Sequence, residues 1–183
     1  MDGVATLADI GTRAVLLDRD GTLNVSPGAH EYVSSPEDFE WLPGAPEALA
    51  LLASAGYFLG IVSNQRGVAL GVTKESALRA IEDLIQQRLS TLGCAIDAFR
   101  YCMHDLDAGC PCRKPAPGLL LGIGVEFGID LSRSWMIGDD EVDVRAGRAA
   151  GCMTALVGPG SSNESADIVA RSLLEASTRL IRA

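Results

Sequence analysis

The chain has 183 residues, 48% of them hydrophobic, and a formal net charge of −9. This length suits one domain, 1–183, with a single apolar core, and the acidic excess argues against nucleic acid or an anionic membrane as a partner, because both are bound by cationic surfaces. No apolar run is long enough to cross a membrane and Met1–Thr12 lacks the features of a secretory signal, so we expect a cytoplasmic protein.

Short apolar runs alternate with helical patterns along the chain. A buried strand is predicted at 14–17, and a helix follows Gly44, with Pro46 near its start and Gly56 just past its end. Thr73 can cap a later helix whose apolar residues recur at helical spacing as far as Gly93. The other predicted elements are strands at 58–62, 99–101, 135–137 and 153–157, the last taken as the final core strand, and helices at 118–127, 142–150 and 173–181.

Strands separated by helices predict a parallel sheet covered on both faces, and such sheets bind ligands at the carboxyl ends of their strands. The segments at these ends are Asp18-Arg19-Asp20-Gly21-Thr22, Ser63-Asn64-Gln65 and Gly138-Asp139-Asp140, with Arg113-Lys114 between the third and fourth strands. Each segment alone also suits an ordinary turn or a helix cap. Because these segments occur together and each follows a predicted strand, they predict a site at one edge of the sheet.

These residue types fit phosphoryl transfer. Asp18 is predicted as the nucleophile that attacks phosphorus, and Asp20 as the acid–base group for the leaving oxygen and then for the attacking water. Mg²⁺ would bridge carboxylate and phosphate, held by Asp18, the backbone carbonyl of Asp20 and Asp139. Ser63 would hold phosphate oxygens, and Lys114 would neutralise the charge that develops on them.

Three of the five cysteines and one of the two histidines crowd into 102–112. Cys102, His104, Cys110 and Cys112 supply three thiolates and one imidazole, which completes a tetrahedral structural zinc site. The loop leads directly into Arg113 and Lys114, so zinc would aim both cations at the substrate phosphate. Cys94 and Cys152 are interpreted as ordinary core thiols.

The ordered motifs resemble the haloacid dehalogenase superfamily, whose four motifs are matched by 18–22, Ser63, Lys114 and 138–143. The resemblance covers roughly 15–157. It implies an α/β fold with a three-layer Rossmann-like core and no large cap domain, and a Mg²⁺-dependent phosphatase that acts on a small phosphorylated metabolite. The departures are Asp140 in place of a common Lys, which adds a carboxylate for the Mg²⁺ shell, Leu70 in place of an Arg, and Met103 and Asp105 in the zinc loop.

Within that superfamily, a zinc loop followed by Arg-Lys-Pro resembles two branches. One acts on D-glycero-D-manno-heptose 1,7-bisphosphate at the 7-phosphate, and the other on histidinol phosphate. The pattern of the loop 24–43 and of 64–71 favours the heptose branch. The resemblance assigns substrate contacts to Asn24, Asn64, Gln65, Arg66, Arg113 and Lys114. Tyr32 and Phe39 are expected to anchor the loop, and His30 to lie at its surface.

Two readings from other classes stay open. One is a catalytically silent zinc-binding module on a phosphatase scaffold, which the presence of Asp18, Asp20, Lys114 and Asp139 argues against. The other is a receiver domain phosphorylated on an aspartate, which would carry that aspartate on a middle strand. The oligomeric state is left open, a monomer included.

Overall fold

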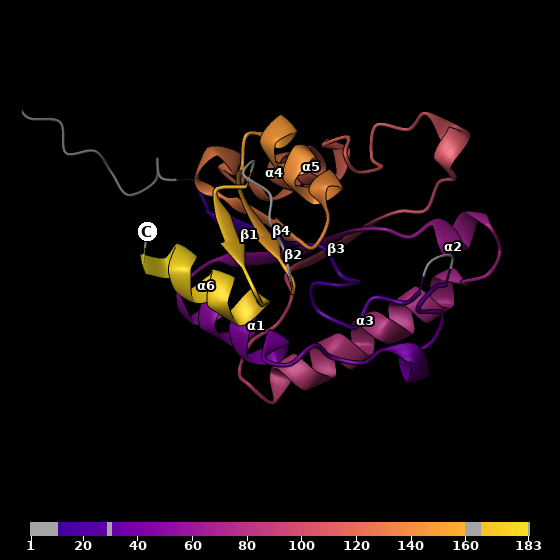
Figure 1. Ribbon diagram of the computed structural model, residues 1–183, viewed down its shortest axis with the longest axis horizontal. Coiled ribbons are helices and arrows are strands. Elements are labelled where there is room, and N and C mark those ends of the chain that lie inside the picture. The colour runs from indigo at the N-terminus through magenta and orange to yellow at the C-terminus, as the bar shows by residue number, and fades with distance from the viewer. Residues whose placement is uncertain (1–10, 29–30, 160–165, 183) are drawn as a thin grey trace, which may run out of the picture.

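The computed structural model describes residues 11–28, 31–159 and 166–182, and it forms one parallel sheet in the order β3-β2-β1-β4-β5-β6 (Figure 1). The strands are β1 (Ala14–Leu17), β2 (Phe58–Asn64), β3 (Ala98–Cys102), β4 (Trp135–Gly138), β5 (Met153–Val157) and β6 (Ile168–Ala170). The α-helices are α1 (Ala45–Ser54), α2 (Arg66–Ala69), α3 (Glu75–Ser90), α4 (Gly118–Phe127), α5 (Glu141–Ala150) and α6 (Leu173–Arg182). Short 3₁₀ turns occur at Pro36–Asp38, Leu106–Ala108 and Leu131–Arg133.

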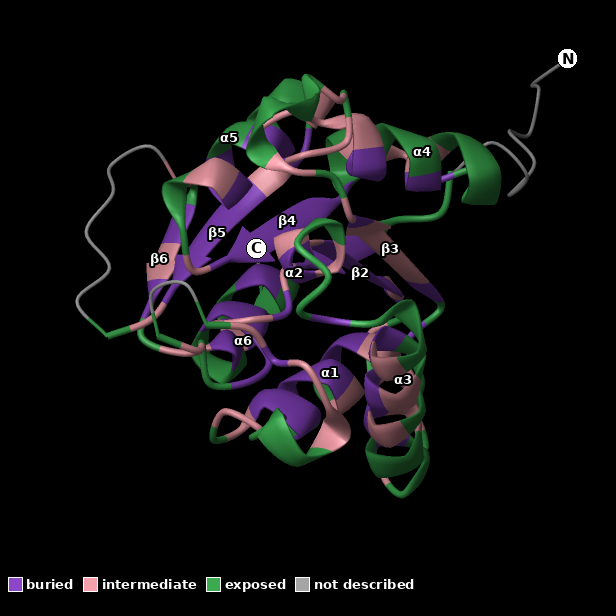
Figure 2. Cartoon of the chain, turned by 90° about the vertical axis from the view of Figure 1, so that its right-hand side faces the viewer, coloured by how far each residue is buried: buried purple, intermediate pink, exposed green. Residues whose placement is uncertain are grey.

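Helices cover both faces of the sheet, because its central strands are apolar on both sides. Along β1, Val15 and Leu17 pack into the core shared with α1, α3 and α6, whereas Ala14 and Leu16 pack with α4 and α5. Figures 1 and 2 show these two helical layers with the buried strands between them. The predicted α/β fold with helices on both faces of a parallel sheet is confirmed. No helix in the described ranges is long and apolar enough to span a membrane.

The structure differs from the prediction at three elements. Thr73 does not cap α3; Lys74 occupies that position without a side-chain bond, and the Thr73 hydroxyl lies 3.4 Å from that of Ser34. The strand at 153–157 is not the last, because β6 extends the sheet beyond it. β6 and α2 span only three and four residues, too few to show a hydrophobic period.

The loop 24–43 is pinned at both ends. Asn24 bridges to Trp41, and the backbone N–H of Val25 donates to Glu40 at 2.8 Å. Phe39 is buried and packs edge-on against Trp41 with ring centroids 5.1 Å apart, so it anchors the loop as predicted. Tyr32 lies against Gly67, where an added Cβ would come within 3.0 Å of its ring. His30 lies outside the described residues.

Candidate active site

Carboxylates from two neighbouring strands meet at the carboxyl edge of the sheet. The backbone N–H of Asp18 donates to the carbonyl of Ile137 at 2.9 Å, which places the end of β1 beside the end of β4. Asp18, Asp139 and Asp143 then offer oxygens that all lie within 4.8 Å of one another. Gly21 makes room for this cluster, since a Cβ there would stand 2.0 Å from an oxygen of Asp139.

Lys114 lies at the centre of this cluster. Its ammonium group is 2.7 Å from Asp18 and 2.6 Å from Asp143, and it donates to the carbonyl of Val62 at 2.9 Å. Burial opposes its charge, but the two carboxylates outweigh burial and raise the pKa of Lys114. Lys114 is therefore a cation stabilised by two carboxylates and placed beside the predicted nucleophile.

The carboxylates still outnumber the cation. Burial, with the charges of Asp18 and Asp143, raises the pKa of Asp139 to about 7. Burial likewise raises the pKa of Asp143 to about 6, although the charge of Lys114 acts in the opposite direction. A crowded set of oxygen ligands with excess negative charge is what a hard divalent cation such as Mg²⁺ requires, so the residues present fit this ion.

This cluster predicts a pH-dependent stability in the absence of metal. Because the pKa of Asp139 is higher in the folded state than its usual value of 3.8, its contribution to stability is present below about pH 4 and is lost as the pH rises through about 7. Mg²⁺ binds the ionised form, so it should raise the melting temperature by several degrees at pH 8 and much less at pH 5. Thermal melts with EDTA and with Mg²⁺ check this. Asp139→Asn should remove most of the difference, and equal stabilisation of the parent at both pH values would contradict it.

Asp20 is surrounded by hydrogen-bond donors. Its carboxylate accepts two bonds from Arg19, one from Asn24 and one from Gln65. Gln65 also donates to the hydroxyl of Ser63 at 3.1 Å. Gln65, which the sequence predicted to contact the substrate, thus links the two predicted catalytic residues Asp20 and Ser63.

Several predicted substrate-binding residues turn toward the protein instead. Asn24 and Gln65 are buried with their amide groups on Asp20. The amide of Asn64 both accepts from and donates to the backbone of Lys114, at 3.0 and 3.1 Å, which holds the loop that carries this cation. The amide nitrogens of all three residues donate to protein atoms, so we interpret the residues as supports of the site, whereas Oδ1 of Asn24 has no partner among the described residues.

The two predicted arginines lie nearer the surface. Arg66 forms a 2.7 Å ion pair with Asp105 of the loop 102–112, and Arg113 donates to the carbonyl of His104 at 3.5 Å. Both arginines are partly exposed residues.

Asp140 differs from its predicted place in the metal shell. Its side chain accepts the N–H of Val142 at 3.0 Å, and Asp143 completes a capping box by accepting the N–H of Asp140. The carboxylate of Asp140 is thereby directed to the start of α5. Asp143, three residues on, enters the carboxylate cluster in its place.

The four predicted zinc ligands come together at the end of β3. The sulfur of Cys102 lies 3.6 Å from that of Cys110 and 3.6 Å from Nδ1 of His104, and this nitrogen is 3.2 Å from the sulfur of Cys112. A sulfur–sulfur distance of 3.6 Å excludes a disulfide, whose bond is about 2.05 Å. Tetrahedral bonds of about 2.0–2.3 Å place ligand atoms roughly 3.3–3.8 Å apart, so the quartet fits zinc.

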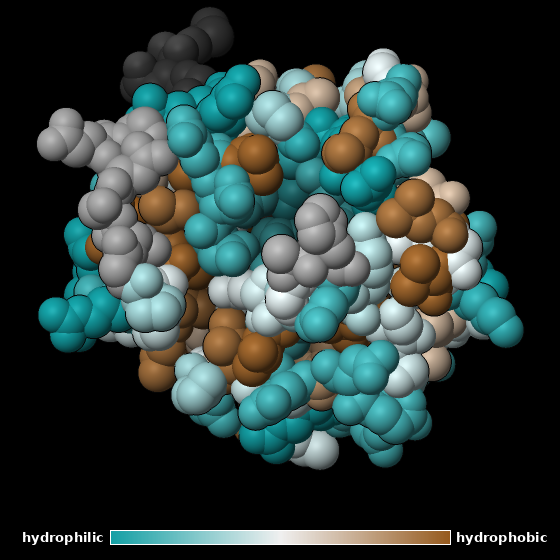
Figure 3. Space-filling model, turned by 45° about the vertical axis from the view of Figure 1, so that its right-hand side comes forward, coloured by the Kyte–Doolittle hydropathy of each residue, from teal (hydrophilic) through white to brown (hydrophobic). Residues whose placement is uncertain are grey.

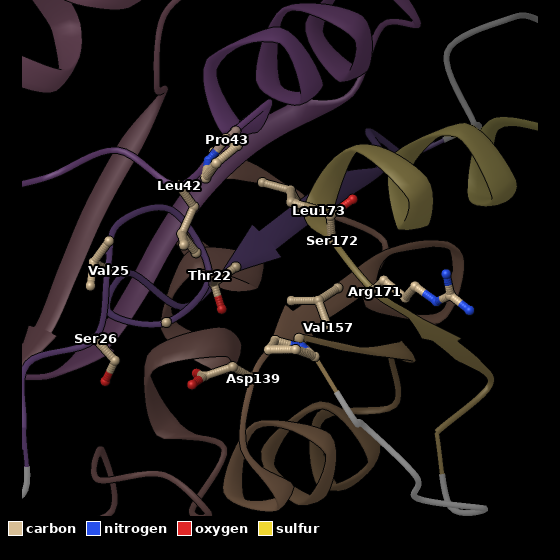
Figure 4. Close-up of a pocket in the computed structure, with 14 residues that line it drawn as sticks. Thr22, Val25, Ser26, Leu42, Pro43, Asp139, Val157, Arg171, Ser172 and Leu173 are labelled. Carbon is tan, nitrogen blue, oxygen red and sulfur yellow. The ribbon is translucent and has the colours of Figure 1, made fainter.

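Two cavities flank the carboxylates. One of about 480 Å³ is lined by Arg113, Lys114 and Leu106 on the side of the zinc loop. The other, of about 600 Å³, is mainly apolar; Figure 4 shows Thr22 and Asp139 at one side of it and Arg171, which follows β6, at the other. The face in Figure 3 shows hydrophilic residues gathered in a central hollow, with separate apolar patches around it.

The family model and the relatives that match this chain agree on one family. Residues 111–176 match the family model described as HAD-hydrolase-like. The D-glycero-β-D-manno-heptose-1,7-bisphosphate 7-phosphatase of Pseudomonas aeruginosa is 36% identical over 146 residues, which cover 80% of this chain and 81% of that protein. The enzyme of the same name from Rhodopseudomonas palustris is 39% identical and covers 85% of both chains.

The fold agrees with that family. The crystal structure of D,D-heptose 1,7-bisphosphate phosphatase from B. bronchiseptica, in complex with magnesium and phosphate, superposes with a TM-score of 0.86 at 32% identity, covering 93% of this chain and 99% of that one. With near full-length similarity in both sequence and structure, the chain belongs to the D-glycero-β-D-manno-heptose-1,7-bisphosphate 7-phosphatase family of HAD-like hydrolases.

Proposed function

We propose that this chain removes the 7-phosphate of D-glycero-β-D-manno-heptose 1,7-bisphosphate through a phosphoryl intermediate on Asp18, with Mg²⁺ at the carboxylates and zinc in the loop 102–112. The observation that carries the proposal is the placement of Lys114 between Asp18 and Asp143 at the carboxyl edge of the sheet, 2.7 and 2.6 Å from them. The proposed nucleophile, the lysine cation and the proposed Mg²⁺ site therefore lie side by side. The relatives that the chain matches over four fifths of its length bear the name of this reaction.

We assign each step of the reaction to a side chain. Asp18 attacks phosphorus, and the bond from phosphorus to the sugar oxygen breaks while Asp20 delivers a proton to that oxygen. Mg²⁺, when bound, offsets the repulsion between the carboxylate of Asp18 and the phosphate dianion. Asp20 then takes a proton from the water that attacks the phosphoryl group, which releases phosphate and restores Asp18. Lys114 stabilises charge on the phosphoryl oxygens throughout.

Asp18 and Asp139 are the carboxylates we assign to Mg²⁺, together with the backbone carbonyl of Asp20. Asp143 is already engaged with Lys114 and with the first turn of α5, so its proposed task is to orient the lysine. Zinc has all four tetrahedral positions filled by protein, which leaves no place for a catalytic water. Its proposed task is to shape the loop that carries Arg113.

The second phosphate of the substrate needs a cation outside the catalytic cluster. Arg113 lines the 480 Å³ cavity that also reaches Lys114, so it is the residue we assign to that phosphate. Arg171 lines the opposite, mainly apolar cavity and offers a matched comparison.

We therefore expect a higher kcat/KM for the heptose 1,7-bisphosphate than for histidinol phosphate. A site that pairs a cation with the second phosphate loses that interaction with a monophosphate. Arg113→Met should lower kcat/KM for the bisphosphate by about tenfold or more and change histidinol phosphate little, since a charged hydrogen bond contributes about 1.5–3 kcal/mol. Steady-state kinetics with saturating Mg²⁺ measure both.

Arg171→Met is the control and should leave both substrates nearly unchanged. A larger effect of Arg171→Met on the bisphosphate would move the second phosphate to the other cavity. Higher kcat/KM for histidinol phosphate in the parent would reject the heptose substrate in favour of the second branch. A parent that hydrolyses no phosphate ester with Mg²⁺ would favour the catalytically silent zinc-binding module.

A further inference from the structure

We propose that Gln65 is a positioning residue for Asp20, and that with Arg19 it links the orientation of this acid–base carboxylate to Ser63 at the phosphate end of the site. The inference rests on the phosphatase function proposed above. It assigns Gln65 a task in proton transfer in place of the substrate contact expected from the sequence.

The carboxylate of Asp20 has two donors on each oxygen. Oδ1 accepts from Nε of Arg19 at 3.1 Å and from Asn24 at 2.9 Å. Oδ2 accepts from Nη2 of Arg19 at 2.9 Å and from Gln65 at 3.1 Å. Donors on both oxygens determine the plane in which the carboxylate lies, and one of these four donors must give way when an oxygen of Asp20 carries the proton that it exchanges.

Arg19 makes this arrangement obligatory. Its side chain is fully buried, and within the described ranges Asp20 is the carboxylate found within ion-pair distance of it. A buried guanidinium without a counter-charge is strongly unfavourable, so Arg19 holds the carboxylate of Asp20 against itself. Nη1 of Arg19 has no hydrogen-bond partner among the described residues, which leaves the cation still more dependent on Asp20.

Gln65 connects this pair to the rest of the site. Its Oε1 accepts from Arg19 at 3.2 Å, while its Nε2 donates to Asp20 and to Ser63, each at 3.1 Å. Its backbone N–H donates to the carbonyl of Cys102 at 2.8 Å, so the residue is also held by the end of β3. At 3% exposure the side chain is covered, and its amide is oriented by three protein partners.

A positioning role has a chemical signature. A sugar alkoxide is a poor leaving group and needs a proton as its bond to phosphorus breaks, whereas a nitrophenolate leaves as a stable anion. A disordered Asp20 should therefore slow hydrolysis of the sugar ester far more than that of the aryl ester. A purely structural disturbance of Ser63 or Lys114 would slow both.

The test compares kcat/KM for heptose 1,7-bisphosphate and for p-nitrophenyl phosphate at saturating Mg²⁺. Gln65→Met keeps the length of the side chain and removes its donors and acceptor. We expect a loss of about 10–100-fold on the sugar ester, part of the 10²–10⁴-fold that general acid catalysis supplies, and less than about threefold on the aryl ester. Gln65→Glu keeps an acceptor for Arg19 without the donors, and should show the same selectivity if Gln65→Met does not fold.

Gln86→Met is the matched control, because among the described residues the amide of Gln86 bonds the backbone of Ile96 alone, at 2.7 and 2.9 Å, away from the site. It should leave both esters unchanged. In an Asp20→Asn background, Gln65→Met should cause little further loss on the sugar ester, since the two residues act through one proton transfer. Equal losses on both esters, or an undiminished loss in that background, would overturn the positioning role. A parent inactive on both esters would instead defeat the proposed function.

Discussion

Asp18→Asn is expected to lower kcat by a factor on the order of 10⁴ or more, because an amide oxygen cannot serve as the nucleophile that forms the phosphoryl intermediate. The fold should persist. The two side chains are nearly isosteric, and Lys114 keeps its partners Asp143 and Val62 when the charge of Asp18 is removed. Steady-state kinetics and thermal melting, measured on the same preparation, separate the two effects.

Asp130→Asn is a suitable control for that substitution. The substitution is the same, Asp to Asn, but at a position remote from the site. The side chain of Asp130 caps the short turn at Leu131–Arg133, and its backbone N–H donates to the carbonyl of Thr12, just before β1 begins. It therefore lies at the opposite edge of the sheet and should affect melting more than turnover. Near-normal kcat in Asp18→Asn would show that another group attacks phosphorus.

Cys112→Ala is expected to release zinc and to lower kcat/KM for the heptose bisphosphate by about a hundredfold. The substitution removes one of four ligands immediately before Arg113 and Lys114, and a shift of about 1 Å in a positioning group can cost that much. The loss should be smaller on an aryl phosphate, because the amide of Asn64 holds the backbone of Lys114 independently of the metal. Within the described part of the chain, the side chain of Arg113 has no comparable clamp, since its hydrogen bond in the loop is a 3.5 Å contact to the carbonyl of His104.

Elemental analysis and kinetics at saturating Mg²⁺ measure the two parts of this prediction. Cys94→Ala is the control, because Cys94 is a partly buried thiol outside the quartet, packed against the core. It should retain zinc and activity. A parent protein purified without zinc, or a zinc-free Cys112→Ala variant with unchanged kinetics, would reject the structural role of the metal.

The sequence predicted the edge of the sheet at which chemistry gathers, because strand ends are readable from apolar runs and the residues that follow them. Asp18, Lys114 and Asp139 accordingly meet where expected. The partners of polar side chains were less predictable. Asn64 bonds the backbone of a residue 50 positions away, a contact that no local pattern indicates.

The carboxylates after β4 show the same limit on a finer scale. The sequence offers the same residue type three times, at Asp139, Asp140 and Asp143. The direction of α5 decides which of them caps the helix and which enters the cluster. Arg19 is a second case. A charged residue between two aspartates suggests a surface turn, yet it is fully buried because Asp20 supplies its counter-charge.

A phosphoryl group on Asp18 during turnover is the most direct test of the proposed function. The parent protein would be mixed with heptose 1,7-bisphosphate and Mg²⁺, quenched rapidly in acid and digested. The masses of its peptides would then be measured by mass spectrometry. The mechanism predicts that the peptide containing Asp18 gains the mass of one phosphoryl group during turnover and loses it when the substrate is consumed. Turnover with no adduct on that peptide, or with the phosphoryl group on another residue, would contradict it.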